Sequence, residues 1–212
     1  MLVRPVNDNT TTTLFVRGAT GIGIFAADTS NNVVKVGSTQ TPANSQILEF
    51  HAKTLIPASA GTHYFVGKGM SPYFGTSAET ANGTGTDPET SFSGGDATDD
   101  LLQNLFLVPV NLTIDEVKFM VSTVTDTDCT INVHLYSYDI KNAGATNDGL
   151  LTNGTLLANG QATAVDRNCI KTVTCTIDSA NVTADKVIAC FVENETNTDS
   201  IYLQTQVLYH FD

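Results

Sequence analysis

Four histidines, at positions 51, 63, 134 and 210, are the side chains that would suit proton transfer or metal binding. Zinc ligands usually recur within a few residues of one another. These four are far apart, and none belongs to a pattern of closely spaced ligands. Strand pairing could bring His134 and His210 together, but a polar outer face of a sheet explains both. We therefore expect no metal site at the histidines.

Two acidic loops place oxygen ligands close together, as calcium requires. One loop contains Asp126 and Asp128, and the other contains Asp96, Asp99 and Asp100. Neither matches the spacing of an EF-hand loop, and acidic turns are common without a metal. No metal or other cofactor is expected, and calcium in one of these loops stays open as an alternative.

The chain has no motif of nucleophilic or phosphate-transfer catalysis. The patterns G-x-S-x-G, H-E-x-x-H and the P-loop are all missing from the sequence. The glycine-rich residues 18–23 do not fit G-x-G-x-x-G, and no predicted helix follows them to face a phosphate. The sequence therefore predicts turn glycines there and no enzyme.

The four cysteines lie at positions 129, 169, 175 and 190, without a C-x-x-C pair. Cys175 and Cys190 fall inside alternating apolar patterns, where a free cysteine behaves as a small buried hydrophobe. A bridge between Cys169 and Cys175 is the alternative in an oxidising compartment.

The formal charge of −12 is unevenly distributed along the 212 residues. Residues 1–70 hold five bases and three acids (+2), so residues 71–212 hold five bases and nineteen acids (−14). The acidic part would repel a phosphate backbone, so no nucleic-acid partner is expected. No stretch reaches the roughly 20 apolar residues of a membrane span, and no leader is evident at the N-terminus, so membrane insertion is not expected either.

Apolar and polar residues alternate over much of residues 105–211, and turn residues interrupt the pattern at short intervals. Side chains two apart share one face of a strand, so such a pattern predicts strands with one buried face. The fold class is therefore all-β, with a C-terminal jelly roll or β-sandwich. Six residues are expected in its core: Ile131, Val133, Leu135, Val187, Phe191 and Val207.

Two domains are expected, a small N-terminal β-region at residues 1–58 and the jelly-roll head at residues 59–212. Residues 75–100 have almost no apolar side chains and should form a long polar loop, namely a linker, a mobile loop or a segment that a neighbouring subunit orders. Residues 179–185 are the one candidate for a short helix.

Residues 104–110, 112–119 and 130–136 follow one another as strand, Val-Pro turn, strand and the strand TINVHLY. This order resembles the trimeric jelly-roll heads of bacteriophage fibre proteins and the C-terminal domain of collagen-like exosporium glycoproteins. Residues 184–192 resemble the beginning of a strand in tumour necrosis factor-like folds, and residues 14–50 are similar to the β-repeats that precede such heads in phage fibres. The resemblance implies a homotrimer and transfers no ligand-binding residues.

The function that this resemblance implies is that of a phage virion structural protein, a capsid decoration or head-fibre subunit on the particle surface. A tail-fibre receptor-binding head is one alternative, and a carbohydrate-binding or carbohydrate-active jelly-roll module is the other. The expected partners are copies of itself, the major capsid protein or another virion protein, and optionally a host-surface glycan. Leu2, Arg4 and Val6, in the arm at residues 1–9, are the candidate particle-attachment residues.

Overall fold

A computed structural model describes residues 45–68, 81–92, 104–141 and 150–212, and the backbone of three strands nearer the N-terminus. At residues 141 and 150 the description again covers the backbone alone. Every element whose bounds the structure describes is a strand, as the alternating sequence predicts. No helix among the described residues is long and apolar enough to cross a membrane.

The chain divides into two compact units, Met1–Gln46 and Ile47–Asp212. In the first unit, β1 (Thr12–Arg17), β2 (Gly23–Asp28) and β3 (Val33–Val36) form an antiparallel sheet in the order β1-β2-β3. The expected boundary lay between residues 58 and 59. It lies earlier because the strand after β3 pairs within the sheets of the second unit.

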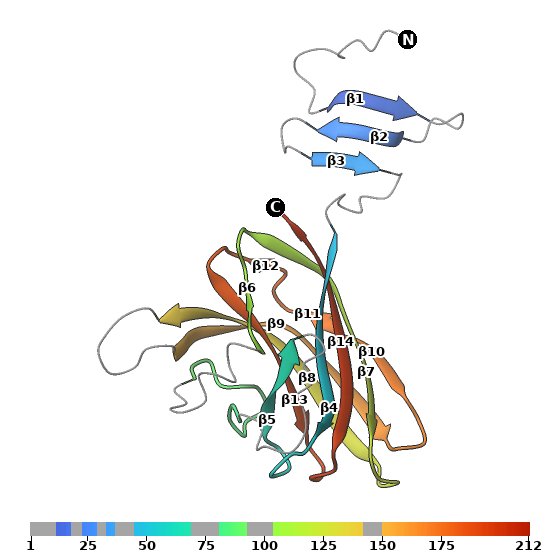
Figure 1. Ribbon diagram of the computed structural model, residues 1–212, viewed down its shortest axis with the longest axis vertical. Coiled ribbons are helices and arrows are strands. Elements are labelled where there is room, and N and C mark those ends of the chain that lie inside the picture. The colour runs from blue at the N-terminus through green and yellow to red at the C-terminus, as the bar shows by residue number, and fades with distance from the viewer. Residues whose placement is uncertain are drawn as a thin grey trace. The chain divides into compact units, whose positions relative to one another are not determined.

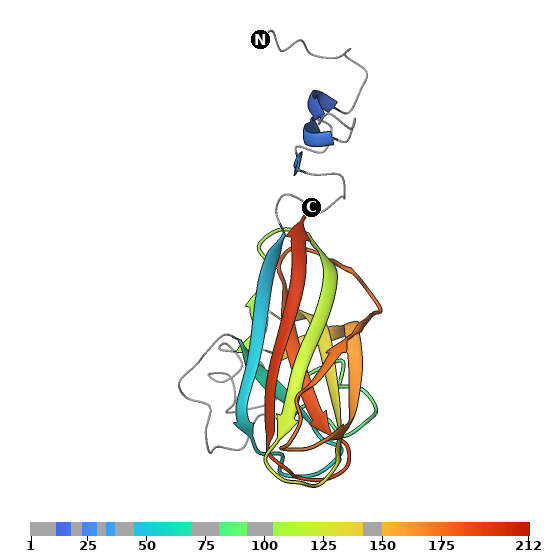
Figure 2. The ribbon, with the colours of Figure 1, turned by 90° about the vertical axis from the view of Figure 1, so that its right-hand side faces the viewer.

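The second unit is a sandwich of two antiparallel layers (Figure 1). The first layer has the order β10-β7-β14-β4, which Figure 2 shows face-on for its last three strands. Its strands are β4 (Gln46–Leu55), β7 (Leu112–Thr123), β10 (Lys171–Thr174) and β14 (Ile201–Phe211). The second layer has the order β5-β13-β8-β9. Its strands are β5 (His63–Lys68), β8 (Cys129–Lys141), β9 (Leu150–Val165) and β13 (Lys186–Asn194).

This strand order is that of a jelly roll. Numbered in chain order, the eight main strands lie as 1-8-3-6 in one layer and 2-7-4-5 in the other. Strands distant in the sequence are therefore neighbours, as in two wound Greek keys. Short strands extend the layers at their margins: β6 (Phe106–Leu107) pairs with β13, β11 (Thr176–Ile177) with β9, and β12 (Asn181–Val182) with β7. Since β12 lies within the segment expected as a helix, that prediction is wrong.

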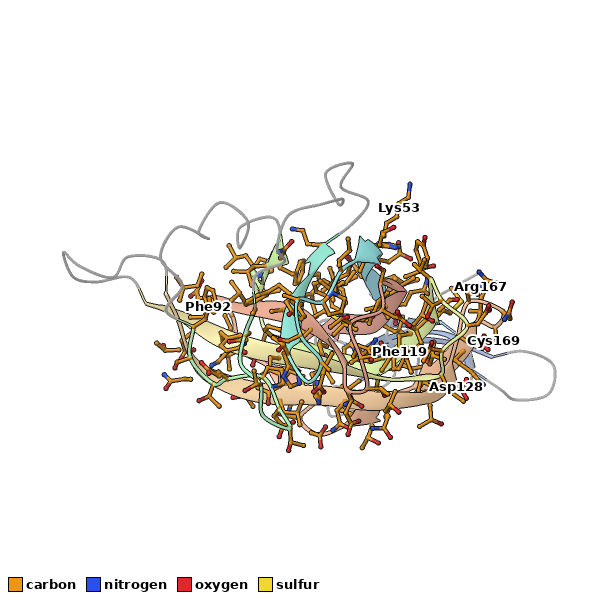
Figure 3. All side chains as sticks on the ribbon, turned by 90° about the horizontal axis from the view of Figure 1, so that it is seen from below. Lys53, Phe92, Phe119, Asp128, Arg167 and Cys169 are labelled. Carbon is orange, nitrogen blue, oxygen red and sulfur yellow. The ribbon has the colours of Figure 1, made fainter. Side chains whose placement is uncertain are left out.

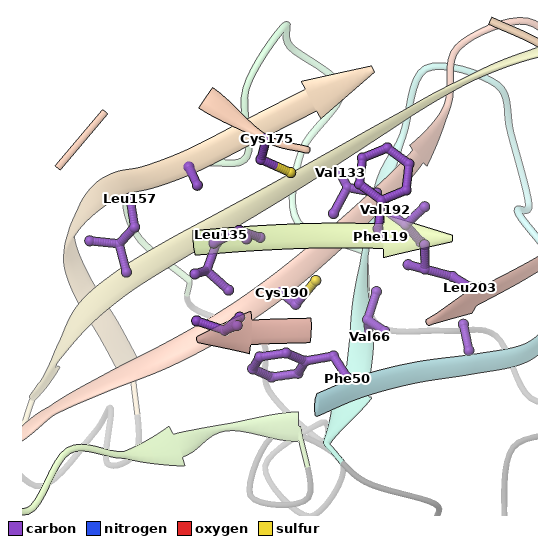
Figure 4. Close-up of a cluster of buried hydrophobic side chains, with 14 of the residues drawn as sticks. Phe50, Val66, Phe119, Val133, Leu135, Leu157, Cys175, Cys190, Val192 and Leu203 are labelled. Carbon is purple, nitrogen blue, oxygen red and sulfur yellow. The ribbon is translucent and has the colours of Figure 1, made fainter. Parts of the chain in front are cut away.

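The core between the layers is built from the inward residues of both sheets (Figure 4). Ile131, Val133 and Leu135 of β8 are buried there, as the alternation predicts, and so is Val207 of β14. Phe50 and Phe119 fill the space opposite them from the first layer. A Leu or Phe buried to this degree typically contributes about 1.5–3 kcal/mol through its removal from water.

A second apolar cluster lies on the other side of the β5-β13-β8-β9 layer. Val187 and Phe191 are buried as predicted, but they belong to this outer cluster. The inward residues of β13 are instead Ile188, Cys190 and Val192. The sequence assigned the wrong face because β13 is buried on both sides, so its apolar residues do not alternate.

Residues 81–92, within the expected polar loop, cover this outer face. The backbone N–H of Asn82 donates to the backbone carbonyl of His63 (2.7 Å), and the backbone N–H of Phe92 donates to that of Leu151 (2.8 Å). The Phe92 ring lies well away from Phe119 of the inner core (Figure 3). Residues 81–92 are therefore a loop, as expected, and hydrogen bonds and apolar contacts from the sheet beneath order them, which the sequence did not predict.

Candidate functional site

A row of four polar side chains crosses the outer face of the second layer. His63 of β5 pairs with Glu193 of β13, Glu193 pairs with Asn132 of β8, and Asn132 pairs with Gln161 of β9. Directly opposed residues on neighbouring strands point to the same face, so the four side chains line up across the sheet.

Hydrogen bonds hold most of this row in one arrangement. Asn132 Nδ2 donates to Glu193 Oε2 and Gln161 Nε2 donates to Asn132 Oδ1, both at 2.8 Å. Glu195 Oε2 lies 3.5 Å from Asn132 Nδ2 and 3.4 Å from Gln161 Nε2. Within the described part of the chain, Gln161 Oε1 has no such partner, so this carbonyl is free to accept a hydrogen bond from a ligand.

A groove of about 670 Å³ opens above the Glu193–Asn132–Gln161 part of the row. Residues 84–87 form one wall, and β8, β9 and β13 form the floor. Among the described residues, the lining contains amides, three carboxylates and no lysine or arginine. The residues that line the groove are Thr84, Gly85, Thr86, Asp87, Asn132, His134, Leu156, Asn159, Gly160, Gln161, Glu193 and Glu195.

Two buried histidines lie beside the groove, with ring centroids 5.0 Å apart. His63 is fully buried, and its Nε2 is 3.5 Å from Glu193 Oε2. His134 is also buried, and its Nε2 is 3.6 Å from Asp87 Oδ1. Among the described residues, neither ring nitrogen of His63 nor Nδ1 of His134 has a hydrogen-bond partner.

Burial controls the protonation of this pair. It lowers the pKa of His63, and the nearby Glu193 and Asp87 only partly offset that effect. Burial, together with repulsion from His63, lowers the pKa of His134 to about 4. Both rings are therefore neutral near pH 7, where an uncharged imidazole can donate and accept hydrogen bonds.

The structure separates the two histidines that strand pairing could have brought together. His134 lies on β8 and His210 on β14, in different layers. His210 Nδ1 instead contacts Asp115 Oδ2 at 3.0 Å. His134 is buried rather than on a polar outer face, beside the His63 ring and the Asp87 carboxylate. No sequence pattern predicts the His63–His134 contact, since 71 positions separate the two and only the sheet brings them together.

The other predicted sites have simple outcomes. Asp126 contacts Arg167 Nε at 2.6 Å, and no cluster of three potential ligands suits a metal in the described ranges. All four cysteines are free, so the alternative Cys169–Cys175 bridge is wrong. Two sets of predicted residues lie outside the described part of the chain: Asp96, Asp99 and Asp100, and Leu2, Arg4 and Val6.

Neither any protein-family model nor any curated protein matches this sequence. Among solved structures, a CocE/NonD family hydrolase from Staphylococcus aureus is 8% identical with a TM-score of 0.37. The match covers 84% of this chain and only 39% of the hydrolase. The CBM22-1 xylan-binding domain of Paenibacillus barcinonensis Xyn10C is 10% identical with a TM-score of 0.30, over 79% and 96% of the two chains.

A chain of turnip yellow mosaic virus is 8% identical with a TM-score of 0.27, over 84% of this chain and 86% of the viral one. Each of these TM-scores is below 0.5. The jelly-roll fold therefore rests on the strand order of the chain itself and not on these matches.

Proposed function

We propose that this chain is a non-enzymatic structural subunit of a phage virion, a capsid decoration or head-fibre protein. The observation that supports this proposal best is the division of the chain into a small three-stranded N-terminal unit and a jelly-roll head. This division suits a particle-bound base and a projecting head. The more acidic charge of the head suits exposure to solvent, where like charges keep particles apart.

The proposed subunit is a homotrimer. A three-stranded sheet is at the lower limit for independent stability, so the N-terminal unit would gain from pairing with copies of itself. In the head, the outer face of the β4-β14-β7 layer exposes three large apolar side chains, Ile47, Met120 and Tyr202. The pairings Tyr202–Ser122 and Gln204–Met120 place Met120 and Tyr202 on the same face. This face offers a second surface for self-association.

A tail-fibre receptor-binding head is the second candidate, and the polar groove above β8, β9 and β13 favours it. A subunit that only covers a capsid has no need for a concave surface lined with hydrogen-bonding side chains. Both candidate functions place the protein on the virion surface. They differ in whether the head binds a host molecule.

Truncation tests the virion assignment. Full-length protein and protein without residues 1–9 would be incubated with particles that lack this subunit, and bound protein would be counted after sedimentation. We expect the full chain to bind and the truncated chain to stay oligomeric but unbound, because Leu2, Arg4 and Val6 anchor it. Binding of neither protein would contradict the virion assignment, and equal occupancy would contradict the arm as the anchor.

A further inference from the structure

We propose that the groove above β8, β9 and β13 binds an uncharged saccharide through the side chains of Asn132, Asn159 and Gln161. This inference deepens the receptor-binding function proposed above and rests on it. It specifies the chemical class of the ligand and the residues that contact it.

The first argument is the chemistry of the groove lining. Amide side chains both donate and accept hydrogen bonds in a plane, which matches pairs of adjacent hydroxyl groups on a sugar ring. Asn132 is fixed between Glu193 and Gln161, so it needs no reordering when a ligand arrives. Asn159 Nδ2 is likewise held by Asp178 Oδ2 at 2.8 Å, which leaves the amide oriented.

The second argument is charge. Asp87, Glu193 and Glu195 line the groove, and none of the described lining residues is a lysine or an arginine. Carboxylates are acceptors, so they favour a ligand rich in hydroxyl donors and repel phosphorylated or carboxylated glycans. The groove therefore selects uncharged over anionic saccharides.

The third argument is the floor and wall of the groove. Leu156 provides an apolar contact for the C–H face of a sugar ring, and Gly160 lines the floor through its backbone, since a side chain there would face the inner core. A Cβ at Gly160 would lie 2.9 Å from Cys175 Sγ and 3.0 Å from Phe119 Cε1, so the close approach of the strands requires glycine there. The opposite wall, residues 84–87, adds the Thr84 and Thr86 side chains. With no Phe, Tyr or Trp among the described lining residues, a weak Kd of about 1 mM is expected for a short saccharide.

The test is a titration of the purified full-length protein with saccharides. NMR monitors the side-chain amide signals of asparagine and glutamine during the titration. The probes are cellotetraose, maltotetraose and chitotetraose, with tetragalacturonate as the anionic control and tetralysine as the cationic one. At least one neutral tetrasaccharide should shift the Asn132, Asn159 and Gln161 signals at about 10 mM, well above the expected Kd. Tetragalacturonate should shift none of them.

Gln161→Ala should weaken binding about fivefold to tenfold, as expected for the loss of a hydrogen bond. Gln206→Ala is the matched control, because Gln206 is also exposed and also donates to a glutamate, Glu49 Oε1 at 2.8 Å, but on the other layer. It should leave binding unchanged.

Three results would overturn the proposal: no shift with any neutral tetrasaccharide, equal binding by Gln161→Ala and wild type, or binding of tetralysine alone. The last would assign the groove to a basic peptide segment. Because the titration needs no particle, its failure is separate from failure of the virion assignment.

Discussion

The ring of Phe92 meets the ring of Phe65 edge to face, with their centroids 5.3 Å apart and their planes at 79°. Phe65 in turn packs against Phe191 at 4.5 Å. This contact joins the end of residues 81–92 to the centre of the second layer. It thereby holds the segment that carries the groove wall, residues 84–87, on the outer face of the sheet.

The first prediction concerns this contact. Phe92→Ala should lower the free energy of unfolding by about 3 kcal/mol, because the ring is buried and its loss leaves a cavity. Hydrogen exchange of residues 81–92 should increase more than that of β7 or β14. Ile56→Ala, at a position that is 50% exposed, is the control and should change stability by no more than about 0.5 kcal/mol. Unchanged exchange at residues 81–92 would contradict this role for Phe92.

The second prediction concerns Gly154, where residues 81–92 approach β9. A Cβ at Gly154 would lie 2.6 Å from Tyr138 Cε1 and 2.8 Å from the Thr90 backbone. Gly154→Ala should therefore cost about 1–3 kcal/mol through overpacking. The matched control is Gly85→Ala, where the nearest atom would be at 3.5 Å. Thermal melting of both variants checks the prediction, and equal melting temperatures would mean that the segment does not approach β9 this closely.

The third prediction is a pH dependence of stability. The folded-state pKa of His134 is lowered to about 4, and that of His63 is also lowered, so the unfolded chain binds more protons than the folded one below pH 6.5. Stability should therefore fall as the pH drops from about 6.5 to 4. The protonation of His134 alone lowers the free energy of unfolding by up to about 3 kcal/mol over this pH range.

Urea unfolding at a series of pH values measures this effect. The carboxylates of Asp87 and Glu193 face the histidine pair and moderate its pH dependence through their attraction for a charged ring. His134→Gln should reduce the pH dependence, whereas His210→Gln, in the other layer, should leave the His63–His134 contribution in place. A stability that is constant between pH 6.5 and 4 would show that the pair is not buried.

The fourth prediction is the oligomeric state. Three chains of 22.5 kDa give a mass of about 67 kDa by light scattering. Tyr202→Lys, on the exposed face of the first layer, should weaken the trimer by placing a charge in the interface, while Thr155→Lys on β9 should not. A mass of 22.5 kDa for the wild-type protein at micromolar concentration and physiological salt would contradict trimer formation.

The alternation of β8 and β14 predicted both the fold class and the inner core, because each strand has one face toward the other layer. The same reasoning failed at β13, where both faces are apolar. A period of two cannot identify the inward face when neither face meets water. Phe191 was correctly expected to be buried, but the cluster that buries it was not foreseen.

The candidate site was beyond sequence reasoning for a different reason. Asn132, Gln161 and Glu193 come from three strands, and their alignment follows from the strand register rather than from any local spacing. The composition of residues 75–100 predicted a long polar loop but not its packing on the sheet, because most contacts that order residues 81–92 come from the sheet rather than from the segment.

Electron microscopy of purified particles, labelled with an antibody fragment against the head, tests the virion assignment most directly. We predict antibody density on the particle surface at regular positions, at the distal end of a projection. The protein should also remain with the particles through gradient purification. Loss of the protein from purified particles, with no surface labelling, would contradict the account.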